Sequence, residues 1–327
     1  MSPELASLAG LPLLEGASED ELAAITGLME PGSAAPGQVL GREGEPGTAF
    51  WLLLEGRVAV TLGGRHLAEA GTGSILGELA LLRQRPRSAT VAALEPCRFL
   101  TGGTEALERM LGIPAVRSRL RRLASARLAQ DLRPVHLSLR DGTDVVLRPL
   151  LPEDRPALDQ AVQHMSRDSI RRRFFTAGTP SPALMDYLMD IDYVDHFAWV
   201  VFEHGGGAGM GTGRYVRRPG DPEAEMAFTT VDPYQGRGLG TLLLGVLGAT
   251  AVEAGITTLV AHVMEDNLPM RRVFAKAGGH TSFDEPGLVL VSVEPERAAE
   301  LIDADVRRRI AESVHDVVTA ASLALRV

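Results

Sequence analysis

The chain has 327 residues, of which 45% are hydrophobic, and its formal net charge is −9. This length is enough for two domains of ordinary size, and the negative charge argues against a dedicated nucleic-acid binder. No run of about 18 uninterrupted apolar residues is present, and the N-terminus lacks the pattern of a signal peptide. The single cysteine, Cys97, excludes an intramolecular disulfide framework. These features predict a cytoplasmic protein with no membrane or nucleic-acid partner. We also expect a monomer without a metal site.

The N-terminal third changes from a helical to a strand-like pattern. Leu5–Met29 predicts a helix on either side of a break, and Ser18 with Glu21 forms a capping box for the second helix. Short β-type runs separated by Gly, Pro and Glu turns follow, namely Val39-Leu40, Phe50–Leu54, Val58–Thr61 and Leu67-Ala68. Short strands with regular turn signals predict a small barrel.

A short helical turn and a strand start lie within this barrel, in the run LGELALLRQRPRSATV. The residues that matter there are Gly77, Glu78, Leu79, Ala80, Arg87, Ser88 and Ala89. The run resembles the phosphate-binding cassette of cyclic-nucleotide-binding domains, and the upstream stretch GREGEPGTAFWLLLEGRVAV resembles their barrel strands. The chemistry fits, because the fork of Arg87 and nearby backbone N–H groups suit a cyclic phosphate. Glu78 would accept a hydrogen bond from the ribose 2′-hydroxyl.

The resemblance implies an allosteric nucleotide ligand, and we expect cAMP. In the family a threonine just after the arginine favours cGMP, whereas Ser88 stands here and leaves the preference less settled. The segment IPAVRSRLRRLASARLAQ predicts the helix that closes over the base in such domains. Arg127 on this helix either contacts the adenine or stays solvated. No helix-turn-helix follows, unlike in DNA-binding regulators that carry this domain.

The C-terminal part is organised around Glu225–Thr241, EMAFTTVDPYQGRGLGT. It predicts a strand that stops at Asp232-Pro233, a glycine-rich turn, and a helix over the apolar run Leu242–Val252 that Gly255 closes. Glycines at a helix N-terminus expose backbone N–H groups where the helix dipole is positive. A pyrophosphate fits such a place.

The turn resembles the acetyl-coenzyme A signature of the GCN5-related N-acetyltransferases (GNAT), Gln/Arg-x-x-Gly-x-Gly/Ala. Its glycine spacing differs from the dinucleotide fingerprint, and no Gly-Lys-Ser/Thr of a P-loop follows. The family's second signature is matched by Asn267 and the short helix that ends at Gly278-Gly279. The two signatures imply that acetyl-coenzyme A contacts Thr229, Thr230, Val231, Gln235, Gly236, Arg237, Gly238, Leu239, Gly240, Thr241, Asn267, Met270 and Arg271.

The mechanism follows from the chemistry of an amine. A lysine side chain has a pKa of about 10.4 and must lose a proton before it attacks, so a carboxylate is needed, and Glu225 is in place as the general base. The resemblance implies that the N–H of Val231 stabilises the oxyanion. Phe274 stands where many members have a tyrosine that reprotonates the thiolate, which leaves the general acid open. Asn267 either contacts the cofactor or caps its helix.

The flanking segments agree with this fold. VVLRPLLPED resembles its first strand, and SRDSIRRRFF resembles the second helix of bacterial protein lysine acetyltransferases. A hairpin is predicted from Phe197–Phe202 and Met210–Val216 around the loop Glu203–Gly209, and a strand from Thr258–Val263. His164 is a candidate for occupying the acceptor site in an inactive state, whereas His262 is expected only to pack in the core. Cys97 is expected to be a buried thiol and no nucleophile.

In its order of elements, nearly the whole chain resembles the bacterial cyclic-AMP-regulated protein lysine acetyltransferases. We expect a cyclic-nucleotide-binding β-barrel at 1–130, a linker at 131–143, a GNAT α/β domain with a mixed sheet at 144–294, and a helical tail at 295–327. The resemblance implies protein substrates, with acyl-coenzyme A synthetases as the expected class. Two alternatives stay open, namely acetylation of a small amine and a nucleotide-sensing adaptor without activity.

Overall fold

The structure is a computed structural model that describes residues 7–131, 134–176, 178–206 and 209–323. Parts of the predicted first helix, linker, hairpin loop and tail therefore lie outside the described residues. The chain divides into two compact units, one made of Met1–Ala124 with Thr319–Val327 and the other of Ser125–Val318. The division falls within α5 (Pro114–Asp131) and α12 (Ala304–Leu323). The predicted domain limits stay predictions.

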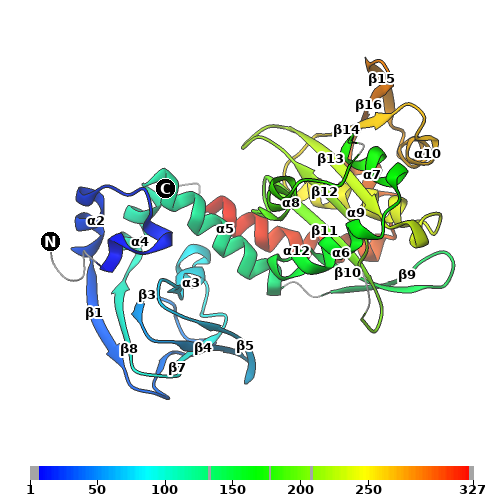
Figure 1. Cartoon of the computed structure of the whole chain (residues 1–327). Coiled ribbons are helices and arrows are strands. Elements are labelled where there is room, and N and C mark those ends of the chain that lie inside the picture. The colour runs from blue at the N-terminus through cyan, green and yellow to red at the C-terminus, as the bar shows by residue number, and fades with distance from the viewer. Residues whose placement is uncertain (1–6, 132–133, 177, 207–208, 324–327) are drawn as a thin grey trace. The chain divides into compact units, whose positions relative to one another are not determined.

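The first unit contains two antiparallel sheets of four strands each (Figure 1). The strands of one sheet, in spatial order, are β1 (Met29–Ala34), β8 (Cys97–Gly102), β3 (Phe50–Glu55) and β6 (Ile75–Leu76). Those of the other are β2 (Val39–Gly41), β7 (Thr90–Ala93), β4 (Val58–Leu62) and β5 (Arg65–Ala70). Side chains from both sheets share one apolar core, with Trp51, Leu53 and Phe99 from the first and Val58 and Val91 from the second. The predicted small β domain is confirmed.

Local chemistry explains the turns and helices of this unit. Gly63 and Gly64 both have positive φ values and join β4 to β5, as a two-residue hairpin with the twist of its strands requires. Ser18 and Glu21 form the predicted capping box at the start of α2 (Glu19–Thr26). The remaining helices are η1 (Pro12–Leu14), α3 (Glu78–Arg83) and α4 (Thr104–Leu111). Cys97 is buried as expected, and burial raises the pKa of its thiol.

The second unit is built on one mixed sheet of eight strands in the order β15-β16-β14-β13-β12-β11-β10-β9. The strands are β9 (Val135–Ser138), β10 (Asp144–Pro149), β11 (His196–Glu203), β12 (Gly209–Val216), β13 (Glu223–Thr230), β14 (Thr258–Met264), β15 (His280–Glu285) and β16 (Leu288–Val293). All neighbours are antiparallel except β13 and β14. The predicted hairpin and strands are confirmed; the sequence pattern did not predict β9, β15 and β16.

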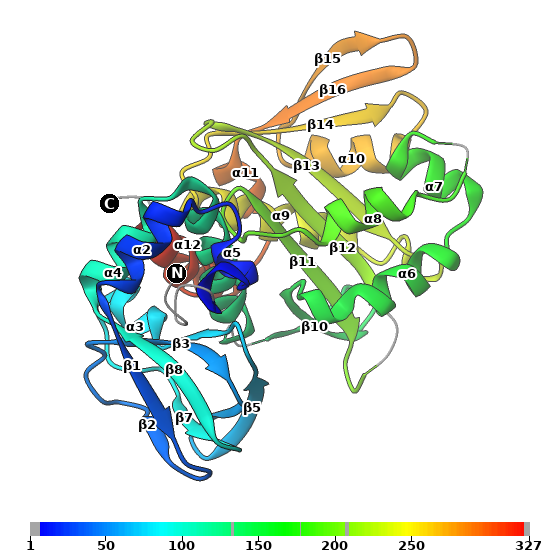
Figure 2. The ribbon, with the colours of Figure 1, turned by 60° about the vertical axis from the view of Figure 1, so that its left-hand side comes forward.

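Helices cover both faces of this sheet (Figure 2). One face carries α6 (Arg155–Gln163), α7 (Arg167–Phe174) and α8 (Pro182–Met189), whose apolar side chains form one cluster. The other face carries α9 (Leu239–Glu253). Strand β12 shows the division, because Thr212 lines a cavity with α6 and α8 whereas Gly213 lies against Leu243 of α9. The remaining helices are η2 (Pro152–Asp154), η3 (Asp232–Tyr234), α10 (Leu268–Lys276) and α11 (Pro295–Ala299).

The predicted helical tail is confirmed as α11 and α12, and α11 and the residues just after it pack against α9 at two glycines. A Cβ atom on Gly248 would lie 2.6 Å from both the backbone N of Ala299 and the carbonyl O of Pro295, and one on Gly245 would lie 2.6 Å from Ile302. Backbone atoms cannot move aside as a flexible side chain can. The glycines therefore let this part of the tail lie directly on the helix that begins at the glycine-rich turn.

We expect Gly248→Ala to destabilise the protein by about 1–3 kcal/mol, because an extra methyl group in a packed interior forces a backbone shift. Chemical denaturation of the full chain would measure this loss. Gly255→Ala is not a suitable control because Gly255 has a φ of +69°. Gly178→Ala is suitable, because no heavy atom lies near the added Cβ there. Equal stability of the Gly248 and Gly178 variants would contradict the close packing.

Within the described residues, no helix is both long enough and apolar enough to cross a membrane.

Candidate functional site

The predicted cassette of the first unit surrounds a buried cation. Glu78, at the start of α3, is fully buried, and Arg87 is 9% exposed. The guanidinium of Arg87 lies 4.1 Å from the ring centroid of Trp51, and its Nη2 donates to the carbonyl O of Ala49 at 3.0 Å. Burial lowers the pKa of Arg87, and the charge of Glu45 acts in the opposite direction. Nη1 is buried and has no hydrogen-bond partner in the described part of the chain.

Two glycines let the guanidinium of Arg87 lie directly against the backbone. A Cβ on Gly77, which has a φ of +81°, would lie 2.5 Å from Nη1 of Arg87, and one on Gly41 would lie 2.7 Å from its Nε. Gly77 also precedes α3, whose first residues are Glu78, Leu79 and Ala80. A guanidinium whose Nη1 has no partner in the described part of the chain, beside glycine backbone, suits an anion that offers two oxygens, such as a cyclic phosphate. The residues present therefore fit the expected nucleotide.

Two cassette residues are more exposed, and one predicted residue lies in the other unit. Ser88 is exposed and Ala89 is partly buried, directly after Arg87. Arg127 is partly buried on α5, beyond the division between Ala124 and Ser125. Its contact with the base stays a prediction.

In the second unit, β13 and β14 pair over only three residues and then separate. The parallel pairing joins Glu223–Glu225 to Thr258–Val260, although β13 continues to Thr230 and β14 to Met264. A cleft of about 370 Å³ lies along this separation. The predicted residues that line it are Glu225, Thr229, Thr230, Gln235, Gly236, Gly238, Leu239, Gly240, Thr241, Asn267 and Met270. The structure thus brings the two predicted signatures together on one cleft.

The glycine-rich turn exposes the N-terminus of α9 to this cleft. Gly236 and Gly238 have φ values of +77° and +96°, which L-residues with side chains rarely adopt. The N–H groups of Leu239, Gly240 and Thr241 lie in the first turn, where helix geometry provides no intrahelical partner. Fifteen residues of aligned peptide dipoles add positive potential. A pyrophosphate group would be stabilised here.

Two cations that the sequence did not reveal line the same end of the cleft. Lys276, at the end of α10, donates from Nζ to Oγ1 of Thr241 at 3.2 Å. The side chain of Arg140 approaches Gly238, with its Cδ 3.7 Å from where a Cβ would be. Arg140 was missed because it lies in the predicted linker, and Lys276, although it lies within the second signature segment, was assigned no cofactor contact. Both charges favour a phosphate at the start of α9.

Hydrogen bonds to Asp232 hold the turn against α7. Asp232 accepts from the Ser166 backbone N at 2.9 Å, from Ser169 Oγ at 2.5 Å and from Gln235 Nε2 at 3.0 Å. Burial opposes its ionisation, but the hydrogen bonds from Ser169 and Ser166 outweigh burial, so its pKa lies below the ordinary value. Gln235 also donates to Ser169 Oγ and to the Thr230 carbonyl. The glutamine of the signature therefore shapes the turn.

Glu225 lies on β13, next to the point where the strands separate. Its side chain is exposed and lines the cleft, and Arg173 at the end of α7 attracts its charge. Arg173 donates from Nε to Oγ1 of Thr229 at 3.0 Å. Burial lowers the pKa of Arg173 to about 10, with Glu225 acting in the opposite direction. An acceptor that reaches Glu225 therefore lies beside the positive charge of Arg173. The sequence did not predict this position, because a run of arginines such as 171–173 is typical of a solvated helix face.

The predicted oxyanion donor needs correction. The N–H of Val231 donates to the carbonyl O of Met210 at 3.0 Å, and its side chain lines a different cavity. Because successive strand residues direct their N–H groups to opposite edges, Met226, Phe228 and Thr230 direct theirs toward β14. The Thr230 carbonyl, which accepts from Gln235, confirms this direction. The N–H groups that face the gap belong to these residues and not to Val231.

Other predicted residues lie at the edge of the cleft or outside it. Asn267 accepts from the Met270 backbone N at 3.3 Å and so caps α10. Arg237 donates to the Pro233 carbonyl and lies 3.6 Å from Asp141, and Arg271 donates to the Glu265 carbonyl. His164 is exposed at the end of α6, with its Nδ1 2.7 Å from the Gln160 carbonyl O. Its occupation of the acceptor site in an inactive state stays a prediction.

The expectation that His262 only packs in the core was wrong. Its side chain is 39% exposed, lines the cleft, and lies with Nδ1 2.7 Å from Oδ2 of Asp284. Strand β14 is buried mainly at its odd-numbered positions, so His262 at the alternate position faces outward. Phe274 also lines the cleft, is 1% exposed, and packs edge-on against Phe228.

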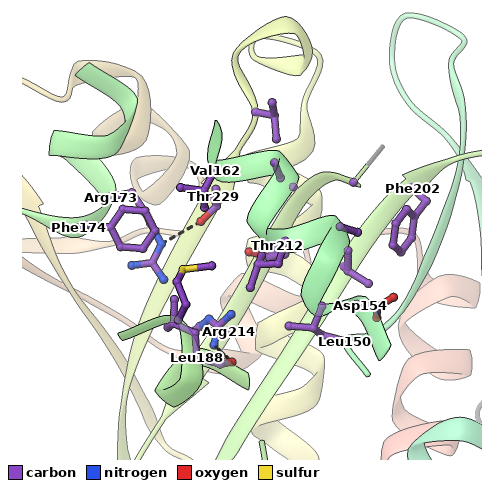
Figure 3. A pocket seen from close by; sticks show the side chains of 18 residues that line it. Leu150, Asp154, Val162, Arg173, Phe174, Leu188, Phe202, Thr212, Arg214 and Thr229 are labelled. Carbon is purple, nitrogen blue, oxygen red and sulfur yellow. Dashed lines mark hydrogen bonds between the residues drawn. The ribbon is translucent and has the colours of Figure 1, made fainter. Parts of the chain in front are cut away.

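A second, smaller cavity of about 30 Å³ lies between the sheet and α6–α8 (Figure 3). Arg173 and Arg214 both line it, and Arg214 donates from Nη1 to the Leu188 carbonyl O at 2.6 Å. Burial, and then the charge of Arg173, lowers the pKa of Arg214 to about 9. Burial and the charge of Arg214 lower the pKa of His196 to about 4. The cavity adjoins the cleft, because Thr229 and Arg173 line both.

Comparisons with known proteins match both halves. Residues 32–112 match the family model of the cyclic nucleotide-binding domain, and residues 144–280 match that of the acetyltransferase (GNAT) domain. Acetyltransferase Pat of Mycolicibacterium smegmatis is 37% identical over 294 residues, which cover 88% of each chain. Acetyltransferase PA5475 of Pseudomonas aeruginosa is 35% identical over 144 residues, which cover 43% of this chain and 77% of that protein.

A solved structure has the same two-part organisation. The cAMP-binding acyltransferase from Mycobacterium smegmatis is 33% identical, the match covers 98% of each chain, and the TM-score is 0.51. The match spans both units with their cassette, cleft and glycine-rich turn. The chain therefore belongs to the Pat family of acetyl-coenzyme A-dependent acetyltransferases, in which a cyclic-nucleotide-binding domain precedes a GNAT domain.

Proposed function

We propose that this protein is a cAMP-regulated protein lysine acetyltransferase that transfers the acetyl group of acetyl-coenzyme A to lysine Nε atoms. The observation that carries the proposal is the position of Glu225 in the cleft that runs to the N-terminus of α9. A carboxylate at the acceptor end and a phosphate site at the other end match an amine that attacks a coenzyme A thioester.

The residues of the cleft divide the work of the reaction. Glu225 removes a proton from the lysine ammonium, directly or through a water molecule. The N–H of Phe228, which faces the gap between β13 and β14, donates to the thioester oxygen as negative charge develops there. The first turn of α9 binds the pyrophosphate, and Lys276 and Arg140 add charge for the phosphates. Gln235 and Asp232 keep the turn in position.

Exposed apolar side chains beside the cleft favour a protein acceptor over a small amine. Phe175 lines the cleft and is 45% exposed. Leu268, between the cleft residues Asn267 and Pro269, is 53% exposed, and Phe283, next to Asp284, is 77% exposed. These three side chains offer apolar area near the reaction site that a protein partner would cover. A small amine or an amino sugar would not require these apolar contacts.

The substrate class, assembly and compartment belong to the same proposal. Acyl-coenzyme A synthetases are the proposed substrates, and the enzyme acts on them as a monomer in the cytoplasm. A single buried thiol, Cys97, suits a reducing compartment. Regulation requires that cAMP bind more tightly to one arrangement of the chain than to another, because a ligand shifts an equilibrium only by its differential affinity.

Mass spectrometry would show which of the candidate amines the enzyme acetylates. The enzyme is incubated with acetyl-coenzyme A and cAMP, together with an acyl-coenzyme A synthetase, with polyamines or with amino sugars. The proposal predicts a mass increase of one acetyl group at a synthetase lysine. Modification of the small amines alone would show that the second candidate function is correct, and no modification of any amine would favour the adaptor.

A further inference from the structure

A histidine that lines the catalytic cleft is paired with a carboxylate, on two strands that neither signature includes. Nδ1 of His262 on β14 lies 2.7 Å from Oδ2 of Asp284 on β15. Asp284 is the extra residue of a β-bulge, because the β15–β16 register shifts between Phe283 and Glu285. Bulges re-aim side chains and are common beside active sites. The sequence pattern does not predict β15, so the pair is recognisable only in the folded chain.

The hydrogen bond defines which nitrogen of the ring is available. An ionised carboxylate only accepts hydrogen bonds, so Nδ1 of His262 carries the proton that Asp284 binds. Nε2 then has a free lone pair, and no other described residue forms a hydrogen bond with the ring. The His262 side chain, which lines the cleft, is 39% exposed, and that of Asp284 is 29% exposed, so both reach solvent.

The pair faces the same side of the sheet as Glu225. In the parallel pairing Glu225 lies opposite Val260, and partners in such a pairing share a face. His262 lies two residues after Val260 and therefore returns to that face. Glu225 and His262 line one cleft from opposite sides of the gap between β13 and β14, where the thioester is proposed to lie.

Resting on the proposed function, we propose that His262 is a second catalytic residue, which carries a proton from the acceptor nitrogen to the sulfur of coenzyme A. Asp284 is its positioning residue. The reaction requires such a group, because the nitrogen loses two protons while the departing thiolate gains one. Phe274, at the position of the family's tyrosine acid, has no proton to donate.

The proton steps balance as follows. The lysine ammonium gives its first proton to Glu225 and attacks the thioester carbon, which forms the C–N bond and leaves the nitrogen cationic. Nε2 of His262 takes the second proton from that nitrogen. The imidazolium, stabilised by Asp284, delivers the proton to sulfur as the C–S bond breaks. The products are the amide and the thiol, His262 is neutral again, and Glu225 releases its proton to solvent.

The other charged groups of the cleft come from several elements. Besides Glu225 on β13, they are Arg172 and Arg173 on α7, Lys276 on α10, and Arg140, while Asp284 on β15 contacts His262 from outside the cleft lining. The remaining titratable group that lines the cleft is the phenol of Tyr234 in the part of the chain that the structure describes. The charges of these groups must be taken into account when pH–rate profiles of the natural chain and the His262 variants are compared.

The test compares steady-state acetylation by the full chain with His262→Ala, Asp284→Asn and a control, His280→Ala, which removes an exposed histidine of β15 that does not line the cleft. We expect His262→Ala to lower kcat about 100-fold, the usual contribution of one acid–base group, while the dissociation constant of acetyl-coenzyme A stays unchanged. Added imidazole should restore part of the rate, because the half-exposed site admits it. Asp284→Asn should lower kcat and should not respond to imidazole.

Each outcome has a distinct meaning. An unchanged kcat in His262→Ala, or a rise in KM alone, would overturn the role of His262 as a proton carrier. Loss of kcat without imidazole rescue, accompanied by a lower melting temperature than that of His280→Ala, would also overturn it, since it would indicate a structural role. Full activity of Glu225→Gln in the same assay would instead contradict the proposed function. The two failures are therefore distinguishable.

Discussion

Glu225→Gln is expected to lower kcat by about 10²–10⁴-fold, the range that positioned acid–base groups contribute. The amide keeps the size of the side chain but cannot remove a proton from the lysine ammonium. Because Glu225 is exposed and forms no ion pair within 4.0 Å in the described part of the chain, the folded structure should lose little stability. Steady-state kinetics with a protein substrate, together with calorimetry of acetyl-coenzyme A binding, would measure both effects.

Glu223→Gln provides the matched control. Glu223 lies on the same strand and the same face two residues earlier, is also exposed, and does not line the cleft. Its loss should leave kcat unchanged. If both variants lost activity equally, the charge of the strand and not the base at Glu225 would be responsible.

Arg87→Ala is expected to weaken cAMP binding at least about 100-fold, because a charge-assisted fork to an anion contributes roughly 3 kcal/mol and 1.4 kcal/mol corresponds to a factor of ten. Turnover should then no longer respond to cAMP. Isothermal calorimetry of the full chain would give the affinity. Since Arg87 also covers the Trp51 ring, Arg87→Met is the second variant, because it keeps an apolar stem over the ring and removes only the fork.

Arg85→Ala is the control for this experiment. Arg85 lies in the same run but is exposed, whereas Arg87 is 9% exposed. Its removal should leave cAMP affinity unchanged. Normal affinity of Arg87→Met would contradict the assignment of the phosphate to this fork.

Local patterns predicted those parts of the fold that local chemistry determines. The capping box at Ser18, the run of buried residues in β3 and the two positive-φ glycines before α9 are each set within a few residues of sequence. The order of residues alone therefore places the signature glycines at a helix N-terminus. The strand pattern around Glu225 is also local, so the sequence alone places Glu225 on β13.

Features that depend on long-range pairing could not be predicted. The Val231 N–H was assigned to the oxyanion although it bonds to Met210 on the neighbouring strand, a pairing that the sequence of β13 alone does not reveal. His262 was expected to be packed because β14 is apolar around it, and its partner Asp284 is 22 residues away across a bulge. Arg140, which follows β9, and Lys276 of α10 both lie at the start of α9, although they are 136 residues apart in the sequence.

The most direct test of regulation is the initial rate of lysine acetylation by the full chain at saturating acetyl-coenzyme A, with and without saturating cAMP. The account predicts a higher rate with cAMP for the natural chain and no difference for Arg87→Met. Equal rates with and without cAMP in the natural chain, when calorimetry shows that both ligands are bound, would contradict it.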